Sequence, residues 1–317
     1  MGIANKTKQV LGVNRRQNQV SQLIKRIDSF RVKSLAALLI AIIATLFPIL
    51  TIASDDALVM GIFPRRGATD TIQSFTPLAN HLSKTLNREV KLETTHDFPS
   101  FWRGVMSRRY DMVHFNQYHY VRSNADAGYQ VIAMNEEFGE SSIAGIIVAS
   151  KDSTIRDHTD LRDKKVIFGG NRQAMLSYIL PTYILRKAGL QDNDYDMQFA
   201  NNPPNALYAL RYGQADAAAI GDVLPSFLAD KPGIKKSANA LVEILRSEAI
   251  AQLPWAVKDT TSPQLRNEIQ QTLLSLNASK EGKEILSAAH LTNIVYADDT
   301  HYDRVRDITS VVLQEEY

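Results

Sequence analysis

The stretch FGGNRQAMLSYILP, residues 168–181, combines the end of a strand, a glycine turn and the start of a helix. A short apolar run, Val166–Phe168, leads into Gly169-Gly170, and apolar residues at helical spacing follow. The first N–H groups of a helix have no intrahelical acceptor and attract anions, and glycine lets a ligand approach the backbone closely. The stretch therefore predicts a strand–turn–helix unit whose turn faces a ligand.

On both sides of this stretch, short apolar strands alternate with amphipathic helices, which predicts an α/β fold. Residues 97–117 and 202–222 follow one plan: a loop, a short helix, a polar turn, an aspartate that opens an apolar strand, and polar residues at the strand end. The two aspartates are Asp111 and Asp216, for which we expect structural roles in the turns. The repetition predicts two similar lobes with a ligand in the cleft between them.

Three arginines lie near strand ends that such a cleft would expose. Ligands of open α/β sheets bind at the carboxyl ends of the strands. Guanidinium groups bind carboxylates and phosphates through paired hydrogen bonds, so Arg65, Arg66 and Arg172 favour an anionic ligand. The alternative for each arginine is a side chain that points into solvent and contacts no ligand. The strand ends concerned are Phe63–Arg66, Phe115–Tyr118, Gly169–Met175 and Gly221-Asp222.

The composition is that of a globular protein without thiol chemistry. The 317 residues are 44% hydrophobic and 22% charged, and none is cysteine, which excludes disulfides, thiolate metal sites and cysteine nucleophiles. Residues 1–33 hold eight of the 36 basic residues and one of the 34 acidic residues, so the remainder is net acidic. We expect no nucleic-acid partner, because proteins that bind nucleic acid present a basic face.

The segment LAALLIAIIATLFPILTIA, residues 35–53, is apolar, uncharged and preceded by the basic stretch. Small residues at Thr51 and Ala53 suit the −3 and −1 positions of a signal-peptidase site. We predict that residues 1–53 form a basic n-region and a cleaved signal peptide that directs the protein to the periplasm. The alternative is a retained inner-membrane anchor through residues 35–53, because the run is about as long as one bilayer crossing.

From residue 57 to about residue 290, the chain resembles the phosphate/phosphite/phosphonate-binding family of periplasmic ABC-importer proteins. The resemblance implies the bilobed type II periplasmic-binding-protein fold, with lobe 1 at residues 57–145 plus 252–317 and lobe 2 at residues 146–251. Two crossing segments, IAGIIVAS and EAIAQLPWAV, would form the hinge. The resemblance rests on GIFPRRGATDTIQSFTPLANHLSK, YDMVHFNQYHYV, IAGIIVASKDSTIRDHTDLRDKKVIFGG, SYILPTYILRKAGL and PPNALYALRYGQADAAAIGD.

At the ligand positions, however, the sequence departs from the family. Phosphonate-binding members carry a Ser-Thr-Ser run at the start of the lobe 2 helix, and alignment on Pro181 places Ala174-Met175-Leu176 there. Two family tyrosines correspond to Phe98 and Phe115, and a family histidine corresponds to Asn202. Recognition would then rest on N–H groups, Arg172 and Gln173, or the ligand is not a phosphonate, which is the interpretation that these departures favour.

The resulting hypothesis is an exported, monomeric solute-binding protein that closes its lobes on a small anionic ligand and passes it to an ABC permease. The alternative is a membrane-tethered periplasmic sensor with a signalling partner. Asp222 could pair with a ligand cation or with Arg172. For each aromatic candidate, packing in the core is the alternative to a contact with the ligand. The candidate ligand-binding residues are Phe63, Arg65, Arg66, Phe98, Phe115, Asn116, Gln117, Tyr118, Arg172, Gln173, Ala174, Met175, Asn202 and Asp222.

The sequence predicts neither catalysis nor a cofactor. It contains no nucleophile elbow, P-loop or Rossmann glycine pattern, so we expect no enzyme activity. The histidines His96, His114 and His119 lack the spacing of a usual metal site.

Overall fold

In the computed structural model of the protein, the structure describes residues 57–64, 67–228 and 240–317. The predicted signal peptide or anchor lies outside the described residues, as do Arg65 and Arg66. Within the described ranges, no helix has the length and apolar character needed to cross a membrane.

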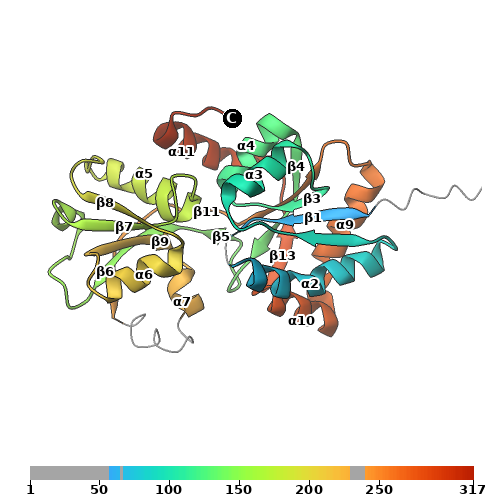
Figure 1. Ribbon diagram of the computed structural model, residues 1–317, viewed down its shortest axis with the longest axis horizontal. Coiled ribbons are helices and arrows are strands. Elements are labelled where there is room, and N and C mark those ends of the chain that lie inside the picture. The colour runs from blue at the N-terminus through green and yellow to red at the C-terminus, as the bar shows by residue number, and fades with distance from the viewer. Residues whose placement is uncertain (1–56, 65–66, 229–239) are drawn as a thin grey trace, which may run out of the picture. The chain divides into compact units, whose positions relative to one another are not determined.

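Lobe 1 is built on a mixed six-stranded sheet with the strand order β13-β4-β12-β3-β1-β2. Strand β1 pairs in parallel with β2 and β3, whereas β12 runs antiparallel to β3 and β4 (Figure 1). The strands are β1 (Leu58–Ile62), β2 (Val90–Glu93), β3 (Met112–His114), β4 (Tyr129–Glu136), β12 (Pro254–Lys258) and β13 (Asn293–Tyr296).

Helices cover both faces of this sheet, because its strands present apolar side chains on each side. On one face, α2, α9 and α10 pack with Met60, Ile62 and Trp255; on the other, α3 and α4 pack around Phe115. The helices are α2 (Ala68–Thr85), α3 (Phe98–Met106), α4 (Gln117–Ala127), α9 (Pro263–Leu274), α10 (Lys280–Ala288) and α11 (Asp303–Leu313), with 3₁₀ turns η3 (Leu276–Ala278) and η4 (Asp299–Tyr302).

Lobe 2 is built on a five-stranded sheet with the order β10-β6-β9-β7-β8. Helix α6 packs on one face and α5 on the other (Figure 1). The strands are β6 (Gly145–Ser150), β7 (Lys165–Gly169), β8 (Asp196–Ala200), β9 (Ala217–Gly221) and β10 (Leu241–Arg246); the helical elements are η1 (His158–Leu161), the π-helix η2 (Met175–Ile179), α5 (Leu180–Lys187), α6 (Pro203–Arg211) and α7 (Leu224–Leu228).

The chain passes between the lobes through two short strands that pair with each other. Strand β5 (Ser142–Ile143) carries it into lobe 2, and β11 (Ile250–Ala251), antiparallel to β5, carries it back. The apolar segment 143–149, part of the crossing segment IAGIIVAS, is therefore divided between two strands: Ile143 belongs to this ribbon, and β6 begins at Gly145. The bilobed α/β fold with a two-segment hinge is confirmed.

The two aspartates of the repeated plan make the same contact in each lobe. Asp111 Oδ2 accepts a hydrogen bond from Val59 N in β1 at 2.8 Å, and Asp216 Oδ2 accepts one from Lys165 N in β7 at 2.9 Å. Each carboxylate thus satisfies an N–H at the start of the neighbouring strand, as expected for a structural role. Asp111 also pairs with Lys258 Nζ at 2.7 Å.

Candidate functional site

One pocket, with a volume of about 90 Å³, is lined by residues of both lobes, and we call it the main pocket. That volume holds several water molecules or a small ligand. Its lining residues lie at the carboxyl ends of β1, β3, β7 and β8 and on the helices that follow, as the rule for open sheets predicts. The lining residues are Phe63, Pro64, Phe98, Asn116, Gln117 and Leu253 from lobe 1, and Gly169, Gly170, Ala174, Met175, Leu176, Ser177, Asn201, Asn202 and Pro203 from lobe 2.

Four helical elements begin at the main pocket. Their first residues, which all line it, are Phe98 of α3, Gln117 of α4, Met175 of η2 and Pro203 of α6. A helix N-terminus carries a partial positive charge, and its first N–H groups lack intrahelical acceptors unless a cap or a proline replaces them. In α6 the first two residues are prolines, and Asn205 N donates to Asn202 Oδ1, so this helix offers its dipole rather than free N–H groups. No charged side chain occurs among the described lining residues.

The lobe 2 wall of the pocket is the strand–turn–helix unit of residues 168–181. Gly170 has φ of 138°, which L-residues rarely adopt, and a side chain at Gly169 would meet the Pro203 Cα at 2.6 Å. The N–H groups of Tyr178 and Ile179 both donate to Ala174 O, which makes the first turn a π-turn. The N–H groups of residues 175–177 precede these intrahelical donors and lie at the pocket wall.

Ser177 contributes a hydroxyl that alignment on Pro181 did not place in the site. The side chain lines the pocket, is 2% exposed, and donates to Gly169 O. Ser177 lies within residues 168–181, so a hydroxyl near this turn was visible in the sequence. Ser177 directly follows the Ala174-Met175-Leu176 run and lies within the π-helix.

On the lobe 1 side, Asn116 links the two lobes. Its Oδ1 accepts from His119 N at 2.7 Å and lies 2.9 Å from His119 Nδ1. Its Nδ2 donates to Gln173 O of lobe 2 at 3.3 Å. Behind it, the Phe98 ring stacks on His119 with centroids 5.0 Å apart. His119 therefore holds the Asn116 amide with its N–H₂ directed at lobe 2.

We expect His119 to make stability depend on pH. Burial, assisted by the charge of Arg122 and opposed by Gln173, lowers the pKa of His119 to about 3. Between pH 6.5 and 3 the unfolded chain binds more protons than the folded one, so the free energy of unfolding falls as the pH decreases. From pH 7 to 5 the loss is about 2 kcal/mol, at about 1.4 kcal/mol per unit below 6.5.

Urea denaturation of the wild type and H119N at pH 7 and 5 measures this effect. Asparagine at position 119 offers Asn116 a side-chain donor but does not titrate. The difference between the losses of unfolding free energy in the wild type and in H119N therefore measures the contribution of His119 protonation. Equal losses in both proteins would contradict the assignment.

Seven predicted residues line the main pocket, and others lie elsewhere. Arg172 Nη1 donates to the Tyr178 hydroxyl, and its guanidinium lies over the Tyr178 and Phe199 rings, 5.3 and 5.8 Å from their centroids. Asp222 pairs with Arg246 at 2.7 Å, rather than with Arg172. The predicted residues that line the pocket are Phe63, Phe98, Asn116, Gln117, Ala174, Met175 and Asn202.

Two aromatic residues of the prediction pack in the interior. Phe115 is fully buried, with its ring edge-on to Tyr129 at 5.5 Å. Tyr118 is 1% exposed and donates through its hydroxyl to Glu315 Oε2 at 2.9 Å. Gln173 contributes its backbone carbonyl to the Asn116 contact rather than lining the pocket.

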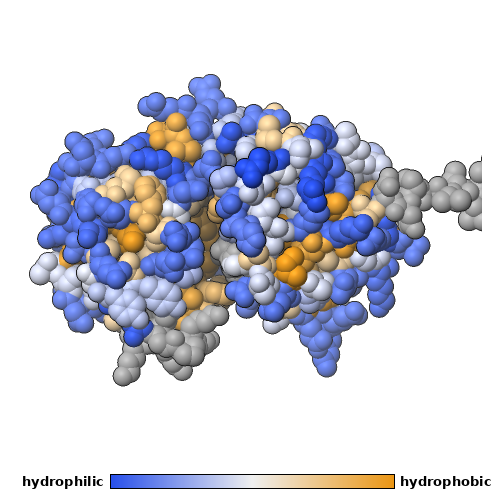
Figure 2. All heavy atoms as spheres, viewed as in Figure 1, coloured by the Kyte–Doolittle hydropathy of each residue, from blue (hydrophilic) through white to orange (hydrophobic). Residues whose placement is uncertain are grey.

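No group of three or more His, Cys, Asp or Glu residues that could hold a metal ion occurs in the described part of the chain. On the face shown in Figure 2, hydrophilic residues predominate and hydrophobic residues form separate small groups.

Residues 60–302 match the family of ABC-transporter phosphonate periplasmic substrate-binding proteins. Since this match covers more than half of the chain, the protein belongs to that family. Its members are transport proteins that bind substrates, and the type II periplasmic-binding fold expected from the sequence is confirmed.

Solved structures share this fold at low sequence identity. PhnD1 from Prochlorococcus marinus in complex with methylphosphonate has a TM-score of 0.73 at 17% identity, over 82% of this chain and 100% of that one. A binding component of an ABC phosphonate transporter from Pseudomonas aeruginosa has a TM-score of 0.71 at 17% identity, over 81% and 87%. XAC2383 from Xanthomonas citri bound to ATP has a TM-score of 0.69 at 15% identity, over 81% and 97%.

Proposed function

We propose that the protein is the substrate-binding component of an ABC importer and binds a small phosphonate, such as methylphosphonate, in the main pocket. The observation that carries this proposal is the meeting of four helix N-termini at one pocket without a charged side chain among its described lining residues. Helix N-termini bind phosphate-like anions through favourable dipoles and free N–H groups, and residues 175–177 at the start of η2 provide such N–H groups here. Membership of the phosphonate family supports the same ligand class.

The chemistry of the pocket walls orients the ligand. The N–H groups of residues 175–177 provide donors for phosphonyl oxygens on the lobe 2 side. On the lobe 1 side, Phe63, Phe98 and Leu253 form an apolar wall for the carbon substituent. A volume of about 90 Å³ limits that substituent to a short chain. These N–H groups take the place of the Ser-Thr-Ser run that the sequence lacks, since the Ser177 hydroxyl already donates its proton to Gly169 O.

Ligand binding would favour closure of the lobes, because the ligand contacts both of them. We place the lobes at residues 57–145 plus 252–317 and 146–251, joined at the β5–β11 ribbon. In this account residues 1–53 direct export to the periplasm and are removed. The closed, monomeric protein then delivers the ligand to a membrane permease.

We expect N116A to shift the unliganded protein toward an open state. The substitution removes the Asn116–Gln173 bond between the lobes, worth about 1 kcal/mol, which is roughly a fivefold change in the open-to-closed ratio. The chain has no native cysteine, so dyes on M106C and Y212C, two exposed positions in lobes 1 and 2, report the separation by energy transfer.

N202A is the matched control for this measurement. Asn202 also caps a helix at the pocket, but its side chain accepts from Asn205 N within lobe 2. N202A should therefore leave the distance distribution unchanged. The same distribution in N116A and the wild type would refute the interlobe role of Asn116.

A thermal-shift screen tests the proposed function. Methylphosphonate, ethylphosphonate, phosphite, phosphate, methanesulfonate and acetate are compared at equal concentration, since a ligand that binds only the folded state raises Tm by mass action. We expect the largest shift with a short phosphonate. A largest shift with acetate or methanesulfonate would reject phosphonate as the ligand class.

A further inference from the structure

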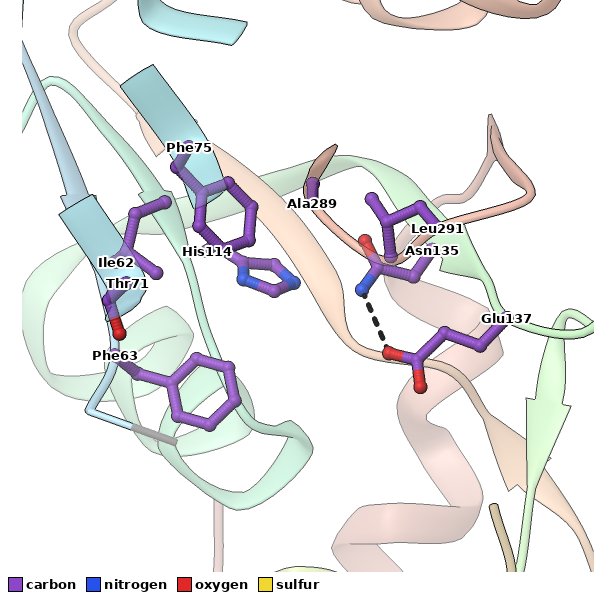
Figure 3. A pocket seen from close by; sticks show the side chains of 9 residues that line it. All are labelled: Ile62, Phe63, Thr71, Phe75, His114, Asn135, Glu137, Ala289 and Leu291. Atoms are coloured by element: carbon purple, nitrogen blue, oxygen red, sulfur yellow. Dashed lines mark hydrogen bonds between the residues drawn. The ribbon is translucent and has the colours of Figure 1, made fainter. Parts of the chain in front are cut away.

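Lobe 1 contains an inner cavity of about 20 Å³ that the proposed function does not use (Figure 3). Four of its polar side chains, Thr71, His114, Asn135 and Glu137, are between 0% and 4% exposed. Apolar side chains form the rest of the wall, and a space of this size holds about one water molecule. The complete lining is Ile62, Phe63, Thr71, Phe75, His114, Asn135, Glu137, Ala289 and Leu291.

Phe63 is the one described residue that lines both the inner cavity and the main pocket. Its ring is 4% exposed, with its centroid 5.3 Å from that of His114 and 6.2 Å from that of Phe98. In Figure 3, the rings of Phe63 and His114 lie across the inner cavity from Asn135 and Glu137. The phenyl ring is thus a partition with a polar compartment on one side and the main pocket on the other.

The far wall of the inner cavity is held in place by hydrogen bonds. Trp255 Nε1 donates to Asn135 Oδ1 at 2.9 Å, which fixes the orientation of the amide. Asn135 Nδ2 then donates to Glu137 Oε1 at 3.5 Å. A substituent that reaches this wall therefore meets polar side chains that already have hydrogen-bond partners.

We propose that Phe63 determines ligand specificity by closing the inner cavity to the ligand. This inference rests on the proposed function, in which the anionic head lies at the helix N-termini and the substituent points toward Phe63. With the ring in place, the substituent must end in the main pocket. Without it, the two spaces join, and a longer substituent reaches the side of Asn135 and Glu137.

Calorimetric titrations of the wild type, F63A and F63L with methyl-, propyl- and 3-hydroxypropylphosphonate test the proposal. The wild type should prefer methyl- to propylphosphonate by at least about tenfold, a difference of about 1.4 kcal/mol. F63A should reduce that preference at least about tenfold, and the hydroxypropyl compound should gain affinity in the same way, because the joined volume admits either chain. F63L, which removes less volume, should give an intermediate ratio and serves as the test if F63A does not fold.

F98A is the matched control, because Phe98 lines only the main pocket and not the inner cavity. It should weaken binding of all three phosphonates while keeping their ratios. Unchanged ratios in a folded Phe63 variant, with the wild type binding methylphosphonate, would overturn this inference alone. A wild type that binds none of the three would overturn the proposed function and this inference with it.

Discussion

Replacing Ala174 by phenylalanine is expected to reduce phosphonate affinity by at least about 100-fold, equivalent to about 2.7 kcal/mol. Ala174 lines the main pocket just before the π-helix that begins at Met175. Its backbone has φ of −81° and ψ of 101°, which a phenylalanine also adopts, and its side chain is not fully buried. A phenyl ring there would occupy the space of about 90 Å³ that the ligand needs.

A188F provides the matched control for A174F. Ala188 is the C-cap of α5, with φ of −80°, at the far end of the same helical segment. The two variants make the same change at partly buried alanines. A general effect of the added ring on folding would therefore weaken methylphosphonate binding in both variants. Titration with methylphosphonate should show lost binding in A174F and wild-type affinity in A188F. Unaltered affinity in A174F would place the ligand elsewhere.

The second large effect is on stability: W255A should lower the free energy of unfolding by about 3–5 kcal/mol. Trp255 is fully buried in β12, and its ring stacks on His114 with centroids 4.4 Å apart. Its Nε1 donates to Asn135 Oδ1. The loss should decrease Tm by about 10 °C, at about 2–4 °C per kcal/mol for a domain of this size.

Two further variants separate packing from hydrogen bonding at this position. W255F keeps an aromatic ring but leaves Asn135 Oδ1 without its donor, which costs about 1–3 kcal/mol. The chain's other tryptophan, Trp102, is partly exposed under the guanidinium of Arg122, so W102A should cost less than either. Thermal unfolding of the three variants should rank them W255A, W255F and W102A. A Trp255 variant as stable as W102A would contradict the packing assigned to β12.

The fold could be predicted from the sequence because apolar residues recur with clear strand and helix spacing, and because residues 97–117 and 202–222 follow the same order of elements. The contacts of Asp111 and Asp216 match the structural roles expected for them. The division at Ala144 was missed because a continuous apolar run does not show where a strand changes partners.

The site was predicted less completely, for two physical reasons. Arg172 stands next to the pocket in sequence, but two aromatic rings offer its guanidinium a cation–π position away from the lining. Ser177 was missed because alignment on Pro181 placed the family's hydroxyl run on residues 174–176. The prediction for Gln117 rested on a strand end and that for Asn202 on a family position, and both residues line the main pocket.

The convergence of helix N-termini was also outside the reach of the sequence. Each start could be located, since a cap such as Asn116 or Asn202 marks it. That four starts meet at one pocket depends on how the lobes pack, which no local pattern encodes. This convergence, rather than an arginine cluster, carries the proposal of an anionic ligand.

The central claim, that the main pocket binds a small phosphonate, is tested most directly by calorimetric titration of the purified wild-type protein with methylphosphonate. The account predicts saturable binding of one ligand per chain, with an affinity higher than that for acetate. No saturable binding of methylphosphonate, together with saturable binding of acetate, would contradict it.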